Sequence, residues 1–148
     1  VVQAVRKSVG RNFPIIFRLS QWKMEHYDAR LVHTPEELAE LVLPLSEAGV
    51  DIFDCSTRYY DAPEFAGSPL TLAGWVRSIT GKPTIGVGAV GVERKPLGDL
   101  IRRVRARELD LVAIGRALLA DYAWAHKTHR GEEASIAPFT RHSLGRLL

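Results

Sequence analysis

An arginine that directly follows a glycine at the end of an apolar run is the feature of this chain best suited to chemistry. Residues 111–114 are apolar and predict a buried strand, Gly115 and Arg116 follow it, and a helical pattern begins at Ala117. A glycine at the end of a strand lets the backbone approach a ligand closely. A guanidinium offers donors in a fork that matches a phosphate group. The pair therefore predicts an anion site.

The strand predicted at 83–90 ends in a second glycine-containing turn. Gly88, Ala89, Val90 and Gly91 form it, and backbone N–H groups of such a turn can point at a phosphate. Any one of these glycines alone is equally explained as a simple turn residue. Two such turns on consecutive strands favour a phosphate site.

The loops after the first two predicted strands carry aromatic and basic side chains. Trp22 follows the strand predicted at 14–20, and Arg58 and Tyr60 follow the strand predicted at 50–57. Such residues can line a pocket for a cofactor or a small-molecule substrate, although packing of the loops against the sheet explains the aromatic ones equally well. Trp22, Arg58 and Tyr60 are therefore candidates for pocket lining.

The composition excludes several classes of function. The 148 residues are 46% hydrophobic and 25% charged, which is typical of one globular domain. The net charge of +3 is dispersed among acidic residues, so we expect no nucleic-acid partner. No apolar run is long enough to span a membrane, and we expect no membrane partner.

Cysteine and histidine usage points away from disulfides and metals. Cys55 is the single cysteine, which excludes an internal disulfide and predicts a cytoplasmic protein. Because Cys55 lies within an apolar strand, we expect a small buried residue. The histidines form no cluster with metal-ligand spacing, and no metal site is predicted.

Apolar runs of strand length alternate with longer helical patterns, which predicts repeated βα units around parallel strands. The predicted strands are 14–20, 50–57, 83–90 and 109–115. The predicted helices are 1–10, 34–49, 69–80, 96–108, one from about 116 and a short one near 138–148. Four such units indicate either half of an eight-fold barrel or a small doubly wound sheet. Since candidate ligand groups gather at strand ends, and the glycine turns follow the last two strands, an α/β fold forming the carboxy-terminal half of a TIM barrel is favoured.

Two of the helices carry informative detail. Thr34 is a candidate N-cap, Pro35 suits the first helical position and Glu37 completes a capping box, while Pro44 is expected to kink or end that helix. The arginines of the helix at 96–108 are spaced around it, which predicts a solvated outer face. They are Arg102, Arg103, Arg105 and Arg107.

Five short motifs, in order, carry a family resemblance. They are Phe17-Arg-Leu-Ser-Gln-Trp-Lys23, Ala48-Gly-Val-Asp-Ile-Phe53, Cys55-Ser-Thr-Arg58, Gly86-Val-Gly-Ala-Val-Gly91 and Ala113-Ile-Gly-Arg-Ala-Leu-Leu-Ala-Asp121. Together they resemble the second half of the old yellow enzyme family, which comprises NAD(P)H:flavin oxidoreductases and ene-reductases. Each motif is weak alone, whereas five on successive predicted strand ends are fairly specific.

The resemblance implies an FMN cofactor and NAD(P)H as reductant. It places Arg18 at the pyrimidine edge of FMN, where a fixed cation would stabilise negative charge on the reduced flavin. It places the FMN phosphate at the turns formed by Gly88, Ala89, Val90, Gly115 and Arg116. These residues are the expected cofactor-binding set, and no catalytic residue is expected in this chain.

The chain also departs from the family pattern. Full barrels have roughly 250 residues, so residues 1–148 are expected to form a single partial domain, the second half of a flavin-binding barrel. The family's substrate-anchoring His with His or Asn, and its proton-donating tyrosine, match no position here. Asp121-Tyr122 stands where the family commonly has Asp-Pro. The abrupt start at Val1 adds to the expectation of a fragment that needs either its amino-terminal half or a second copy to complete the barrel.

Three functions remain open at this point. The first is the FMN-binding half of an oxidoreductase that reduces activated alkenes. The second is another phosphate-binding barrel enzyme, such as an aldolase or isomerase, although Asp54 is the only internal strand carboxylate to serve it. The third is a noncatalytic half-barrel module.

Overall fold

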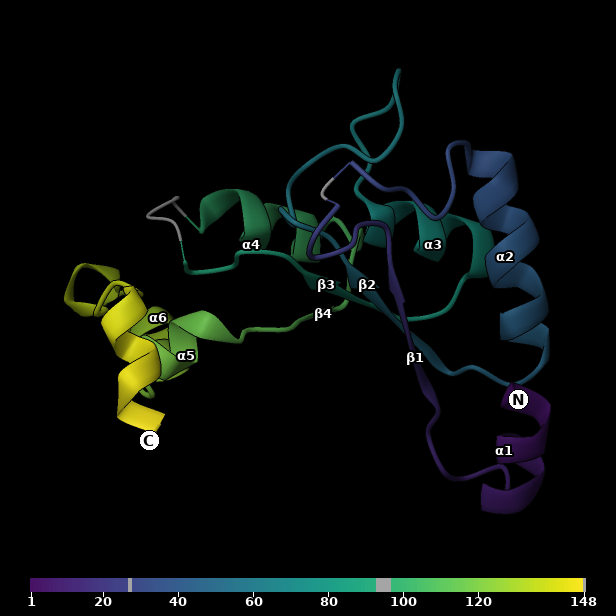
Figure 1. The fold of residues 1–148 in the computed structure, drawn as a ribbon, viewed down its shortest axis with the longest axis horizontal. Coiled ribbons are helices and arrows are strands. Elements are labelled where there is room, and N and C mark those ends of the chain that lie inside the picture. Colours follow the sequence, from purple (N-terminus) through teal and green to yellow (C-terminus); the bar gives the residue numbers. More distant parts are fainter. Residues whose placement is uncertain (27, 93–96, 148) are drawn as a thin grey trace.

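The computed structural model describes residues 1–26, 28–92 and 97–147, and in them four parallel strands form one sheet (Figure 1). The strands lie in the order β1-β2-β3-β4. Their bounds are β1 Ile16–Ser20, β2 Ile52–Ser56, β3 Thr84–Val87 and β4 Leu111–Val112. The prediction of parallel βα units is confirmed.

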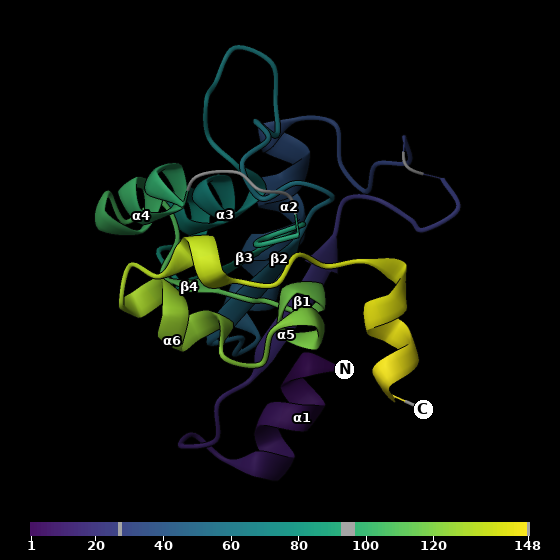
Figure 2. The ribbon, with the colours of Figure 1, turned by 90° about the vertical axis from the view of Figure 1, so that its left-hand side faces the viewer.

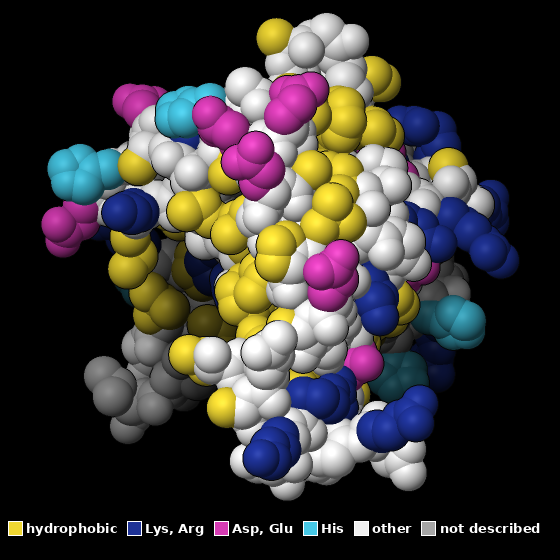
Figure 3. Space-filling view, turned by 90° about the vertical axis from the view of Figure 1, so that its right-hand side faces the viewer, with side chains coloured by type: hydrophobic (Ala, Val, Ile, Leu, Met, Phe, Trp, Pro, Cys, Tyr) yellow, Lys and Arg dark blue, Asp and Glu magenta, His cyan; other side chains and the backbone are white. Residues whose placement is uncertain are grey.

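Helices alternate with these strands along the chain. Their bounds are α1 Val2–Val9, α2 Pro35–Glu47, α3 Leu72–Thr80, α4 Gly98–Arg105, α5 Arg116–Ala120 and α6 Trp124–His129, followed by the 3-10 helices η1 Glu133–Ser135 and η2 Arg141–Leu147. Figures 1 and 2 show α2, α3 and α4 side by side along one face of the sheet. Figure 3 shows the side that carries α1 and α2, where apolar side chains and charges of both signs share the surface.

The core lies between the sheet and α2 and α3. Phe53 of β2 is fully buried, as are Leu38 and Val42 of α2 and Leu72 and Val76 of α3. Alternate strand residues point to opposite sides of a sheet, so the side chains of odd-numbered residues in β1 and β2 face these helices. Burial of apolar area on this side supplies the main driving force for the fold.

The other side of the sheet is open, and we call it the inner face. Ile16 and Leu111, at its two edges, are 54% and 52% exposed. Arg18 of β1 pairs in register with Asp54 of β2, so both side chains lie on this face. Apolar side chains and a charged pair therefore share the face that would line the interior of a barrel.

Helix α2 begins as predicted and ends at Glu47, within the predicted range of 34–49. Thr34 Oγ1 accepts a hydrogen bond from Glu37 N at 3.2 Å, whereas the Glu37 carboxylate reaches back to His33 N at 2.7 Å. The helix does not end at Pro44, because its last turn is closed by a bond from Ala48 N to Pro44 O at 2.9 Å. Proline lacks only the N–H group, so its carbonyl can still accept.

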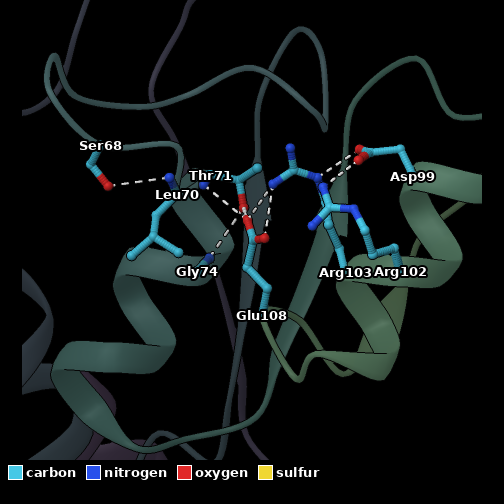
Figure 4. Close-up of polar contacts among 8 residues, drawn as sticks. All are labelled: Ser68, Leu70, Thr71, Gly74, Asp99, Arg102, Arg103 and Glu108. Atoms are coloured by element: carbon cyan, nitrogen blue, oxygen red, sulfur yellow. Dashed lines mark hydrogen bonds and ion pairs between the residues drawn. The ribbon is translucent and has the colours of Figure 1, made fainter.

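The prediction of a fully solvated arginine face on α4 is wrong for Arg103. Its side chain is buried and donates to both oxygens of Glu108, at 2.7 and 2.8 Å (Figure 4). Glu108 Oε1 also accepts from the backbone N and the hydroxyl of Thr71, at 3.1 and 2.8 Å. Helical periodicity misses this role because the partner carboxylate lies beyond the end of the helix. The cluster joins α3 to α4.

The last strand is shorter than predicted. Strand pairing covers only Leu111–Val112. Beyond it, Ala113 N donates one backbone hydrogen bond to Gly86 O at 3.0 Å. The segment near the carboxyl end forms the 3-10 helix η2. Apolar periodicity therefore locates the strand but overstates its length, because pairing requires a neighbouring strand as well as an apolar run.

We expect Gly74→Ala to lower the free energy of unfolding by about 1–3 kcal/mol. An added Cβ would lie 2.7 Å from Glu108 Cγ, and that side chain is held by Thr71 and Arg103. Gly98→Ala is the matched control, because an added Cβ there meets nothing within 4 Å. Urea denaturation of both variants measures the difference, and equal stabilities would contradict this account of the cluster.

Candidate functional site

The structure places Arg18 on the inner face with its side chain 61% exposed. Its Nη2 donates to Ser56 Oγ at 3.0 Å, and its Nη1 lies 3.7 Å from Asp54 Oδ2. Ser20, two residues on, donates to Trp22 O at 3.1 Å, which is the role of a loop hydroxyl. The guanidinium is therefore held from one side by β2 and remains accessible from the other.

The turn after β3 is shaped by close backbone approach. A Cβ on Gly88 would lie 2.7 Å from both Thr57 O and Tyr60 N, and Gly88 O accepts a bond from Tyr60 N at 3.0 Å. Ala89 adopts a φ of 53°, a left-handed conformation uncommon for a residue with a side chain. Turns with left-handed residues can gather N–H groups into an anion-binding concavity. Val90 is buried as a whole residue, so it packs beneath this turn.

Gly91 packs the same turn closely against the helices that follow β4. A Cβ on Gly91 would lie 2.6 Å from Trp124 Nε1 and 2.9 Å from the Ala117 Cβ. The turn after β3 and the helices α5 and α6 therefore form one packed unit. Trp124, the first residue of α6, is itself buried.

Gly115 and Arg116 lie where the sequence predicts, at the start of α5. Gly115 is its N-cap, no side chain caps the helix, and an added Cβ at Gly115 meets nothing within 4 Å. Arg116 is exposed, and its guanidinium carbon lies 5.8 Å from the ring centroid of Phe139. A cation over an aromatic face is attracted to it, so the carboxy-terminal segment helps to place this side chain.

Asp121 fastens that segment. Its Oδ2 accepts from Lys127 Nζ at 2.6 Å and from Ala137 N at 3.0 Å, and Lys127 also donates to Ser135 O at 2.9 Å. Bonding to the Lys127 ammonium, together with the backbone bonds, holds the pKa of Asp121 below its ordinary value. In the sequence, Asp121 is only the last residue of the fifth motif, and nothing there announces this role.

Trp22 and Arg58 line a common hollow of about 270 Å³ between the loops that follow β1 and β2. Tyr60 does not line it. The Tyr60 side chain is buried, and the residue borders a separate void of about 10 Å³ beside Gly88, room for about one water molecule. The sequence pattern could not show that Trp22 lines the hollow and Tyr60 does not, because both residues follow strands at the same edge of the sheet.

A buried polar group that the sequence did not reveal also lines the larger hollow. Glu64 is buried, forms an ion pair with Arg30 and accepts from Gln21 Nε2 at 2.7 Å. Gln21 Oε1 in turn accepts from the backbone of Leu31 and Val32, at 2.9 and 3.0 Å. Glu64 and Gln21 are 43 residues apart in sequence, so no local motif announces the contact.

Strand order brings the two predicted phosphate turns together. They follow β3 and β4, which are neighbours, whereas Arg18 lies on β1, two strands from β3. Neighbouring strands are about 4.8 Å apart, so Arg18 and the turn at Gly88 are separated by about 10 Å across the sheet. An extended ligand with an anionic end is needed to reach both.

The remaining polar groups do not extend the site. Cys55 faces the helices, and burial raises the pKa of its thiol, so it is no nucleophile. Among residues 1–26, 28–92 and 97–147 no group of three or more His, Cys, Asp or Glu is placed to hold a metal ion. In the same residues no helix combines the length and the apolar character needed to cross a bilayer.

Comparisons with known proteins agree with this architecture. No protein-family model matches the chain. An NADH oxidase from Thermoanaerobacter brockii is 28% identical over 145 residues, which cover 92% of this chain and 21% of that protein. Morphinone reductase in complex with tetrahydroNAD is a structural neighbour with a TM-score of 0.66 and 18% identity, over 96% of this chain and 35% of that one. The resemblance to the old yellow enzyme family is confirmed.

A second neighbour, a 2-naphthoyl-CoA reductase in complex with 2-naphthoyl-CoA, has a TM-score of 0.64 and 21% identity, over 92% of this chain and 21% of that one. The chain thus spans about a fifth to a third of the proteins it matches. The predicted fold, an α/β half of a TIM barrel, is confirmed.

We expect the stability contributed by Asp121 to depend on pH in a defined direction. Because its folded-state pKa lies below the ordinary value of 3.8, the contribution is complete above that value and is lost as pH falls through the folded-state pKa. Asp121→Asn should therefore lower the unfolding free energy at pH 7 and flatten its fall in acid. Denaturant titrations from pH 7 to pH 2 measure this, and an unchanged acid limb in the variant would contradict it.

Proposed function

We propose that the chain is the FMN-binding half of an NAD(P)H-dependent flavin oxidoreductase that reduces activated alkenes such as enones. When bound, FMN would supply hydride transfer from NAD(P)H to the alkene through N5, and the proton that completes the reduction would come from a group outside this chain. The observation that carries the proposal is the exposed Arg18 guanidinium on the inner face, in a sheet whose next strands end in two anion-compatible turns. We also propose a cytoplasmic location.

The residues present fit a flavin mononucleotide. Its phosphate is a dianion. The open backbone at Gly115 and the neighbouring Arg116 guanidinium would offer it donors, together with the left-handed turn at Ala89. The long polyol chain of FMN suits the path from the turn at Gly88 to Arg18, which covers two strand spacings across the sheet and three residues along it, about 14 Å in all. Gly88, Ala89, Val90, Gly115 and Arg116 would hold the phosphate in this assignment.

Arg18 would face the pyrimidine edge of the ring system. A fixed cation there stabilises negative charge that develops on reduction, and its bond to Ser56 restricts the side chain before the ligand arrives. Trp22 and Arg58 line the 270 Å³ hollow, where a substrate would be enclosed by both loops. Tyr60 supports the turn at Gly88 through its backbone.

Groups that anchor and protonate a substrate would come from outside this chain. We propose that either an amino-terminal half-barrel or a second copy of the chain covers the inner face and supplies them. The exposure of Ile16 and Leu111 supports this, since apolar area on an open sheet gains free energy when it is covered.

Arg116→Gln should weaken FMN binding by roughly 10- to 100-fold, because it removes charge-assisted hydrogen bonds to the phosphate. Quenching of flavin fluorescence during titration of the chain measures the dissociation constant. Arg105→Gln is the matched control, since Arg105 is exposed on α4 and lies on no proposed contact. Equal affinities for both variants, or no binding to the unaltered chain, would contradict the proposal.

The open inner face also predicts association. Size-exclusion chromatography with light scattering should find a dimer, or the chain bound to an added amino-terminal half. Leu111→Ser should weaken this association, because Leu111 is half-exposed at the edge of that face. A well-folded monomer at all concentrations would refute the association.

A further inference from the structure

The Arg18–Asp54 pair differs from the ion pairs of two other aspartates, which lie just before β2 and β4. Asp110 pairs with Arg77 and also accepts from Thr84 N at 2.9 Å, and Asp51 pairs with Arg6 and accepts from Ile15 N at 2.7 Å. Each of these carboxylates fastens a helix to the start of a strand.

Among the described residues, no backbone N–H group donates to the Asp54 carboxylate. It lies in the middle of β2, where the ladders to β1 and β3 already join its neighbours. Its Oδ2 is 3.7 Å from Arg18 Nη1, and its Oδ1 is buried with no hydrogen-bond partner among the described residues. An unpaired buried carboxylate oxygen costs free energy. A purely stabilising role does not account for it.

The surroundings concentrate the effect of this charge. On the inner face Asp54 lies in register beside Ile85 of β3, and Ile52 precedes it on the same side of β2. The Asp54 side chain is 15% exposed, whereas that of Arg18 is 61% exposed. The carboxylate is therefore set beneath the guanidinium, in a weakly polar environment where charges interact more strongly than in water.

We propose that Asp54 is a positioning residue for Arg18, and that its negative charge limits how strongly Arg18 stabilises an anionic group on the inner face. The proposal rests on the proposed function, in which that group is the pyrimidine edge of a reduced flavin. Ser56 fixes one arm of the guanidinium and Asp54 attracts the other. The fixed charge at the flavin is thus the sum of a near cation and a slightly more distant anion.

Two variants separate charge from shape. Asp54→Asn removes the charge with little change in size, and Asp54→Glu retains it. The first readout needs no flavin: the side-chain N–H signals of Arg18 in nitrogen-15 NMR spectra, assigned with Arg18→Lys. We expect these signals to be sharp in the unaltered chain and in Asp54→Glu. In Asp54→Asn they should be broader, because the guanidinium has lost its charged partner.

The second readout is the midpoint potential of FMN bound to the same proteins. Asp54→Asn should raise it, corresponding to stabilisation of the reduced state on the order of tenfold, and Asp54→Glu should leave it near that of the unaltered chain. An unchanged or lower potential in Asp54→Asn would overturn the proposal.

The two readouts fail in different ways. If the chain binds no FMN, the proposed function is refuted, while the NMR signals still decide whether Asp54 positions Arg18. If FMN binds and the Arg18 signals are the same in all variants, the positioning role is refuted and the proposed function stands. Should Asp54→Asn not fold, Asp54→Ala removes the same charge, and the Arg18 signals should broaden in it; unchanged signals would refute the positioning role.

Discussion

Parallel pairing of β2 with both of its neighbours is the constraint on which the rest of the structure depends. The register sets Arg18 beside Asp54 and sends Phe53 to the opposite face. A shift of one residue would bury the charges under the helices and expose the core. The same pairing aligns the strand ends, so that the turn at Gly88 meets the loop at Tyr60.

Close packing then holds the loops after β2, β3 and β4 against one another. Gly88 lies against the loop after β2, Gly91 lies against Trp124, and Asp121 fastens the segment that carries Phe139 to Arg116. Three loops that would be mobile by themselves are thereby joined at the carboxyl edge of the sheet. A site assembled from loops needs such support to hold its donors in place.

Local signals in the sequence were sufficient for the elements and for part of the site. Thr34 and Pro35 mark the start of α2, and the glycines mark both turns. Contacts outside the helical and strand periodicities were beyond reach. Arg103 is buried and bonds to Glu108 past the end of its helix, Tyr60 is packed rather than exposed, and Glu64 bonds to Gln21, 43 residues away. Asp54 was visible as a strand carboxylate, but its relation to Arg18 follows only from the register. The phosphate and ring contacts themselves stay predictions.

The central claim is that this chain anchors a flavin by its phosphate, and the ratio of its affinities for FMN and riboflavin tests it most directly. The two ligands share the ring system and the polyol chain and differ in the phosphate alone. Isothermal titration at one ionic strength should find FMN bound at least tenfold more tightly, as charge-assisted bonds to a phosphate imply. Equal affinities would contradict the account.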